Sequence, residues 1–255
     1  MKKLICFACF IALSLTSCST GGDSSPATES DVLVKKSVET YALDGSVVTT
    51  NYTYNGKRLV KETDSDGYYE KFTYTGDLIT KVEYFSDSDE LEETETFTYN
   101  SSDQLIMYVR SEIFDDLGFK ETYVYNSNGT VTSTGYSGDA TTQDNEVSTG
   151  TIHLSSGEVS FIELDFGGDT TTHTYTYDTK NTPYMNITGF DKIAFVDSEA
   201  IGLHHNIVTD TSNDFSGNTV TTTTYTYNSL NFPLTDSEIE GTDATSVIST
   251  VYTYN

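Results

Sequence analysis

Aromatic residues recur along the chain in an alternating pattern. Seven triplets place two aromatic side chains around one residue, which is Thr in all but one case; they begin at positions 52, 72, 97, 123, 175, 225 and 252. On a β-strand, residues two apart share one face, and the residue between them points to the other. Each triplet therefore predicts a strand with an aromatic face for a core and a polar face for solvent.

A polar turn and a second apolar strand follow most triplets. Asn55-Gly56 and Thr75-Gly76 are pairs that tolerate the positive φ of hairpin turns. The return strands begin at Leu59, Leu78, Leu105, Val131 and Val159. No long stretch has helical periodicity, so we expect an all-β fold. Repeated antiparallel β-hairpins, about fourteen strands in all, would form an extended twisted meander or a partial barrel.

The repeat is interrupted in its second half. The intervals from 123 to 175 and from 175 to 225 are about twice the others, which indicates degenerate copies, one of them visible from position 151. Residues 180–210 break the pattern with a Pro and irregular apolar positions. We expect this insertion to be a loop or short helix that caps one end of the sheet and buries Phe190 and Phe195. A binding loop is the alternative.

The motif Y-x-Y-[ND], followed by a short turn and an apolar strand, resembles the YD repeat of RHS-type proteins. It is also similar to lipoproteins of Bacteroidota that carry short arrays of such repeats. The resemblance covers residues 32–255, which we expect to form a single β-repeat domain with the irregular insertion near 180–210. It implies no established activity, and the array is too short for the large closed shell of the RHS proteins.

The chain begins like an exported protein. Two lysines precede an apolar run from Leu4 to Leu15, which is too short to cross a hydrocarbon core of roughly 30 Å as a helix. The following LTSC, ending at Cys18, resembles a bacterial lipobox. That resemblance implies that residues 1–17 are a lipoprotein signal peptide and that the Cys18 thiol is acylated.

Residues 18–31 would then be the lipidated Cys and a flexible tether, since they are rich in Gly, Ser and other small polar residues. Ser19, rather than Asp, follows Cys18, which favours the outer membrane; whether the domain faces the periplasm or the cell surface stays open. The other cysteines, Cys6 and Cys9, lie in the signal peptide. We therefore expect a mature domain without disulfides.

Charge limits the partners of this chain. It has 13 Lys and Arg against 39 Asp and Glu, a net charge of −26, which becomes −28 once Lys2 and Lys3 are removed. Such acidity repels nucleic acid and anionic membrane surfaces, so membrane attachment must rest on the N-terminal lipid. Disorder is the other explanation for an acidic chain, but 19 Tyr and 13 Phe at regular spacing argue against it.

Candidate chemistry is sparse. His204 and His205 with Asp210 suggest a metal site, but neighbouring residues on a strand face opposite ways, and we expect no metal. The acidic links 64–66 and 87–89 offer oxygen ligands for Ca²⁺ without the spacing of a calcium loop; solvated turns are the preferred interpretation. We find no nucleophile elbow and no mature free thiol, and we expect no enzyme and no cofactor.

Two functions from different classes remain. The first is a non-catalytic binding module for an envelope or extracellular glycan or protein. The alternative is a structural or assembly scaffold of the cell envelope. A binding module needs solvent-facing aromatic rings beyond those in the core, because Tyr offers flat contact surface at low entropy cost. The candidate ligand-facing residues are Tyr68, Tyr84, Tyr108, Tyr136, His204 and His205.

Overall fold

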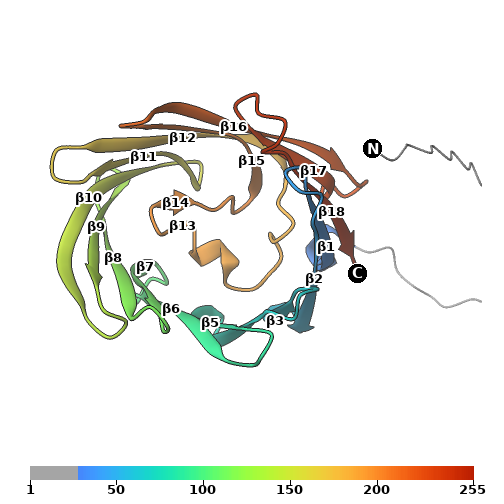
Figure 1. The fold of residues 1–255 in the computed structure, drawn as a ribbon, viewed down its shortest axis with the longest axis horizontal. Helices are drawn as coiled ribbons and strands as arrows, with labels where there is room; N and C mark the ends of the chain where they lie inside the picture. The colour runs from blue at the N-terminus through green and yellow to red at the C-terminus, as the bar shows by residue number, and fades with distance from the viewer. Residues whose placement is uncertain (1–27) are drawn as a thin grey trace, which may run out of the picture.

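The computed structural model describes residues 28–255, which form a closed antiparallel β-barrel (Figure 1). The expected signal peptide, Cys18 and most of the tether lie outside the described residues. The elements are η1 (Glu29–Asp31), β1 (Val34–Tyr41), β2 (Val47–Asn55), β3 (Arg58–Thr63), β4 (Tyr69–Thr75), β5 (Leu78–Phe85), β6 (Leu91–Tyr99), β7 (Leu105–Glu112), β8 (Leu117–Tyr125), β9 (Thr130–Gly138), β10 (Gln143–Ser155), β11 (Glu158–Asp165), β12 (Thr170–Asn181), η2 (Phe190–Lys192), β13 (Phe195–Val196), β14 (Glu199–Ala200), β15 (His205–Asp214), β16 (Gly217–Tyr227), β17 (Pro233–Glu240) and β18 (Ile248–Tyr254).

The all-β antiparallel prediction is confirmed, but the sheet is closed rather than a meander or partial barrel. β1 pairs with β2 on one side and with β18 on the other. Closure pairs the two edge strands whose backbone groups an open meander leaves exposed. Sixteen strands form the wall instead of about fourteen, because the degenerate copy near position 151 supplies a full hairpin, β10–β11.

The triplet aromatics point into the barrel. Tyr52 and Tyr54 are half-buried while Thr53 between them is exposed, and the middle residue is exposed in every triplet. The Tyr52 hydroxyl lies 3.3 Å from that of Tyr184, which belongs to the segment inside the barrel. The alternation therefore separates an aromatic inner face from a Thr-rich outer face.

Inward tyrosines also link one hairpin to the preceding strand. The hydroxyls donate to main-chain carbonyls over 2.7–2.8 Å: Tyr54 to Val34, Tyr99 to Ile79, Tyr177 to Val159, Tyr225 to Ile207, and Tyr254 to Pro233. The partners are 18 to 21 residues apart in sequence. Each such bond is worth about 1 kcal/mol. Four of these five tyrosines are the second aromatic of their triplet and Tyr225 is the first, so aromatics of the repeat also bind each strand to the one before it.

The irregular insertion folds into the barrel, where Figure 1 shows it in the middle of the ring. We call residues 182–204 the plug; it contains η2 and the short hairpin β13–β14. Phe195 is buried and its ring meets Tyr123 edge-on at 4.9 Å, whereas Phe190 is half-buried. A backbone bond from Thr188 to the carbonyl of Lys57 holds the plug to the β2–β3 turn.

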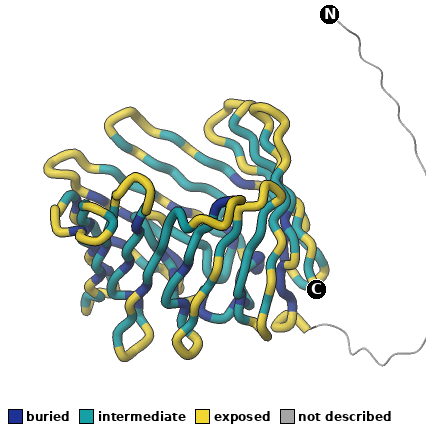
Figure 2. Tube along the Cα trace, turned by 60° about the horizontal axis from the view of Figure 1, so that its bottom comes forward, coloured by how far each residue is buried: buried dark blue, intermediate teal, exposed yellow. Residues whose placement is uncertain are grey.

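The two ends of the barrel differ. Connections such as β2–β3 and β4–β5, together with the plug, lie at one end, which we call the plug rim. Connections β1–β2, β3–β4, β5–β6, β7–β8, β9–β10, β11–β12, β15–β16 and β17–β18 form the other end, the open rim. Exposed residues mark the turns at both ends in Figure 2. β1 begins at the plug rim, where the Asn186 side chain donates to the carbonyls of Glu29 and Val32.

Candidate functional site

The plug leaves a chamber of about 420 Å³ between itself and the wall of β12 and β15–β18. Carboxylates and aromatic rings share its lining: Asp210, Asp236, Glu238, Tyr175, Tyr225 and Tyr252. The Tyr252 hydroxyl donates to Asp236 over 2.7 Å. Burial raises the pKa of Asp236 and of Glu238. This chamber therefore presents hydroxyl donors, carboxylate acceptors and flat rings together.

A second chamber of about 320 Å³ lies between the plug and the wall of β3–β6. Glu62, Glu70 and Glu95 line it beside apolar side chains of wall and plug. The register places Glu62 of β3 directly opposite Glu70 of β4. Like charges at directly opposed positions on a sheet repel, so the fold keeps an unfavourable pair here.

The pKa values of this pair reflect burial first and nearby carboxylates second. Burial raises the pKa of Glu62 to about 8, and the charge of Glu70 adds to the effect. Burial likewise raises the pKa of Glu70 to about 7, with smaller contributions from Glu95 and Glu93. A cationic group that entered the chamber would favour the ionised carboxylates and relieve their repulsion.

Glu95 gathers two tyrosine hydroxyls in the same region. Tyr84 donates to Glu95 over 2.9 Å and Tyr108 donates over 2.6 Å. Burial, with the neighbouring Glu95 charge, raises the pKa of both tyrosines, which stay protonated donors at neutral pH. Side chains of the wall therefore supply two of the hydrogen bonds that the Glu95 carboxylate can accept.

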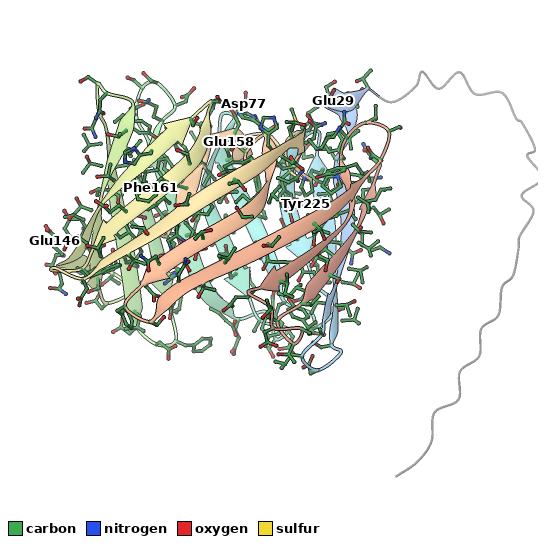
Figure 3. The ribbon with its side chains drawn as sticks, turned by 90° about the horizontal axis from the view of Figure 1, so that it is seen from above. Glu29, Asp77, Glu146, Glu158, Phe161 and Tyr225 are labelled. Atoms are coloured by element: carbon green, nitrogen blue, oxygen red, sulfur yellow. The ribbon has the colours of Figure 1, made fainter. Side chains whose placement is uncertain are left out.

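A buried carboxylate of the wall holds the end of the plug. Glu158, at the start of β11, accepts backbone N–H bonds from Leu203 (3.1 Å), His204 (2.9 Å) and His205 (2.9 Å). The His205 ring Nδ1 lies 3.3 Å from the same carboxylate. Figure 3 labels Glu158 and Asp77, the latter in the β4–β5 turn, along the same edge of the barrel. The plug is thus fastened to the wall at the plug rim.

Two further contacts fix the tip of the β13–β14 hairpin. Glu121 of β8 is buried and accepts from the Ser198 backbone N–H over 3.2 Å and from the Tyr123 hydroxyl over 2.8 Å. The Arg110 guanidinium of β7 is paired with Asp197 of the hairpin. Ionic and backbone contacts from β7, β8 and β11 therefore position the plug.

The four predicted ligand-facing tyrosines do not form one solvent-facing cluster. Tyr84 and Tyr108 occupy inward register positions and share one carboxylate acceptor; Tyr108 is only 1% exposed. Tyr136 lies on the outer wall, with the Lys120 ammonium 4.5 Å from its ring centre. Tyr68 is exposed in the β3–β4 connection. Strand parity separates them, because neighbouring register positions alternate between the lumen and the exterior.

His204 and His205 lie where the plug joins β15. Their ring centres are 6.5 Å apart at an interplanar angle of 75°, and their backbone N–H groups both donate to the Glu158 carboxylate. His205 also lines the larger chamber together with Asp210. Within residues 28–255, no group of three or more His, Cys, Asp or Glu side chains is placed to hold a metal ion.

The acidic turns have a structural use. Asp64 accepts backbone N–H bonds from Asp66 (2.9 Å) and Tyr68 (3.0 Å), which closes the β3–β4 connection. Asp89 accepts the hydroxyl of Tyr69. Asp64 thus caps its own turn and Asp89 binds a neighbouring strand, and neither arrangement needs an ion to explain it.

Sequence reasoning missed the inward carboxylates Glu62, Glu70, Glu95 and Glu121. A signal was present: Glu70, Glu95 and Glu121 each stand two residues before a triplet. Residues two apart on a strand share a face, so these acids had to join the aromatics in the lumen. We considered the acids of the turns and did not apply this parity to the acids of the strands.

The outer wall is polar over most of its register. One outward row, in cross-strand order, runs Thr253, Lys36, Asn51, Thr63, Tyr69 and Phe85. Two outward lysines lie over the stacked rings at the end of this row: Lys61 is 3.9 Å from the Tyr69 ring centre and Lys71 is 4.3 Å from that of Phe85. No helix within the described part of the chain has both the length and the apolar character to cross a membrane.

Comparison with protein-family models and with curated protein sequences found no match. Among solved structures, the chain is similar to a porin-like protein from Bacteroides uniformis, with a TM-score of 0.53 and 14% identity over 90% of this chain and 99% of the other. A porin-like protein from Bacteroides vulgatus gives a TM-score of 0.55 and 9% identity, covering 88% of this chain and 99% of that one. At such identities the likeness shows the barrel fold alone.

Proposed function

We propose that this chain is a non-catalytic binding protein of the bacterial envelope, tethered by a lipid on Cys18, and that its ligand enters the barrel lumen through the open rim. The observation that carries the proposal is the lumen itself. It is filled from the plug rim and leaves chambers of about 420 Å³ and 320 Å³ beside the plug.

The chemistry of the chambers suits a polar ligand. Tyrosine rings offer stacking surfaces, their hydroxyls donate, and the carboxylates accept hydrogen bonds or pair with cations. Sugar rings and basic side chains both fit such a lining. The proposed ligand is accordingly a glycan or a protein segment of the envelope or its surroundings.

The outer wall supports a domain that stands in water. Barrels embedded in lipid carry an outward apolar band roughly 25 Å tall between aromatic girdles. Here the aromatics point inward and the middle residue of each triplet, Thr in all but one, is exposed on the outside. A membrane attachment through acylated Cys18 is consistent with such a wall. In this proposal the barrel is carried by the outer membrane without crossing it.

The larger chamber can be blocked by one substitution with a matched control. Thr221 and Thr222 are neighbours on β16; Thr221 pairs with Asp210 and lines the chamber, while Thr222 pairs with Thr209 on the outer face. We expect Thr221→Trp to fill the chamber and Thr222→Trp to leave it open. Glycan and peptide arrays probed with Cys18→Ala protein, and then with each Thr variant in that background, provide the measurement.

Ligands of the chamber should be lost with Thr221→Trp and kept with Thr222→Trp, at equal thermal stability. Hits that survive both substitutions, or no hit in either array, would contradict a lumen receptor. The second result would favour the scaffold function, in which the lumen holds no ligand.

The anchor has its own test. Cys18→Ala should move the domain from the membrane fraction to the soluble fraction of cells, since the outer wall offers no lipid-facing band. Retention of the Cys18→Ala protein in membranes after a salt wash would contradict a lipid tether.

A further inference from the structure

The open rim carries exposed apolar side chains that the fold does not use. Six lie in its connections, and we call them the rim tips: Leu43, Tyr68, Ile113, Phe114, Phe166 and Phe215. Three are largely in solvent, with Leu43 76%, Phe114 66% and Phe215 93% exposed. They come from five different connections, so the exposed apolar side chains are spread around the open rim and do not belong to one loop.

The plug rim provides the comparison. Its connections at 56–57, 76–77, 100–104, 126–129, 156–157 and 228–232 contain no exposed large apolar side chain among the described residues. Phe232, in the last of them, is fully buried against Tyr254. The connections at both rims reverse the chain between adjacent antiparallel strands. Turn geometry therefore does not explain why apolar tips occur at one end only. Large apolar side chains that are exposed in the connections of one rim and not of the other favour a role of the open rim in binding.

Charge identifies the kind of partner. The open-rim connections contain eleven acidic residues and no Lys or Arg: Asp44, Asp64, Asp66, Asp87, Asp89, Glu90, Asp115, Asp116, Asp139, Asp169 and Asp243. An anionic lipid surface would be repelled by such a ring, and so would a second open rim of the same chain. A surface that is both basic and apolar is complementary to it.

Two cavities at the mouth join the tips to the inner carboxylates. One of about 240 Å³ is lined by Tyr68 together with Glu62 and Glu70. Another of about 360 Å³ is lined by Phe114 together with Glu93 and Glu112. In each cavity an aromatic ring from the rim stands beside carboxylates of the lumen wall. An apolar side chain and a neighbouring ammonium or guanidinium group would both find a partner in these places.

We infer that the open rim docks a basic polypeptide segment with interspersed apolar side chains, which lies across the rim tips and places its cations at the carboxylates of the mouth. The inference rests on the proposed binding function and narrows its ligand to a protein partner. The apolar contacts anchor the segment, while the carboxylates select its charge and speed its approach.

Three synthetic peptides of equal length test this inference: Lys alternating with Leu, Lys alternating with Ser, and Glu alternating with Leu, each with one Trp. The protein has no Trp, so peptide fluorescence reports binding without background. With Cys18→Ala protein, we expect the Lys/Leu peptide to bind at least about tenfold more tightly than either of the others, and more weakly at high salt.

Matched double variants locate the contact. Phe114→Ser with Phe215→Ser removes two rim tips; Val124→Ser with Val251→Ser removes two side chains that are also exposed, 61% and 51%, but lie on wall strands. We expect the tip variant to weaken Lys/Leu binding about tenfold or more and the wall variant to leave it unchanged. All four sites are exposed, so neither variant should unfold the barrel.

Equal affinity for the Lys/Leu and Lys/Ser peptides, or equal effects of the tip and wall variants, would overturn the inference. Flotation of the protein with neutral phosphatidylcholine vesicles, lost in the tip variant, would also overturn it by assigning the tips to lipid. If a chamber ligand sensitive to Thr221→Trp is found while the Lys/Leu peptide fails, the rim inference alone falls and the proposed function stands.

Discussion

Glu62 and Glu70 are single residues that the fold holds in an unfavourable environment, because both carboxyl groups are buried and lie opposite each other. Both belong to inward positions next to the aromatic pattern, and the register sets them face to face. Pairing with an inward cation would relieve them, but Lys61 and Lys71, one position along the same strands, point outward to Tyr69 and Phe85. The sheet separates each acid from the base beside it in the sequence.

Glu62 should make the stability of the barrel depend on pH. Its carboxyl has an ordinary pKa of 4.5 when unfolded and about 8 when folded, so the folded state binds more protons between these values. The contribution to stability is complete below about pH 4.5 and is lost as the pH rises through 8. Glu62→Gln should therefore raise the free energy of unfolding at pH 8.5 by about 1–3 kcal/mol and change little at pH 5.

Thermal unfolding followed by circular dichroism at pH 5 and pH 8.5 measures this effect, at about 2–4 °C per kcal/mol for a domain of this size. Glu83→Gln is the control, because Glu83 lies on the outer face of β5 and pairs with Lys81 at 2.6 Å. The same gain at both pH values for Glu62→Gln would show that the lumen does not perturb this carboxyl.

At the scale of elements, the plug is separate in sequence from the repeat but is bound into the wall. Its last residues, Leu203 and His204, and His205 at the start of β15 donate backbone N–H groups to Glu158. The tip of the plug hairpin contacts Glu121 and Arg110. A hydrogen bond to a charged acceptor contributes about 1.5–3 kcal/mol net of the bonds to water that it replaces. Loss of one wall carboxylate should therefore release the end of the plug while the barrel stays closed.

Glu158→Ala tests this element, with Glu163→Ala on the outer face of the same strand as its control. We expect amide hydrogen exchange at residues 198–205 to speed up about tenfold or more in Glu158→Ala, with little change in β6–β9. Uniform acceleration across the barrel would mean that Glu158 supports the whole fold rather than the plug.

Prediction from sequence succeeded at this scale where local rules decide. Period-two alternation and Asn-Gly turns were sufficient for the hairpins, and the break at 180–210 located the insertion. The site of the insertion inside the lumen was not predictable in the same way. It depends on contacts such as Glu158 with Leu203 and Arg110 with Asp197, which join residues far apart in the chain.

At the scale of the whole molecule, closure depends on the seam between β1 and β18, where Val38 faces Val251. Local patterns cannot predict it, because an open meander and a closed barrel share every other strand pair. The candidate site shares this limit. Its carboxylates could be assigned to the inner face by parity, but their grouping into chambers requires the closed ring and the plug.

The seam gives a prediction for the molecule. Deletion of residues 248–255 should expose the edges of β1 and β17 and yield oligomers or aggregates in size-exclusion chromatography. The control is a circular permutant that joins Asn255 to Leu33, whose backbone N–H donates to the Asn255 side chain over 2.9 Å, and opens the chain between β15 and β16. It keeps every strand pair and should remain monomeric. A monomeric truncation would contradict a stabilising role for the seam.

The start of β1 at the plug rim also sets a direction. A lipid on Cys18 would hold the barrel by its filled end, and the chain from Cys18 to Val34 can extend to no more than roughly 55 Å. The open rim would then face away from the bilayer. In the proposed function, a ligand of the lumen would then reach the open rim from the side that faces away from that membrane.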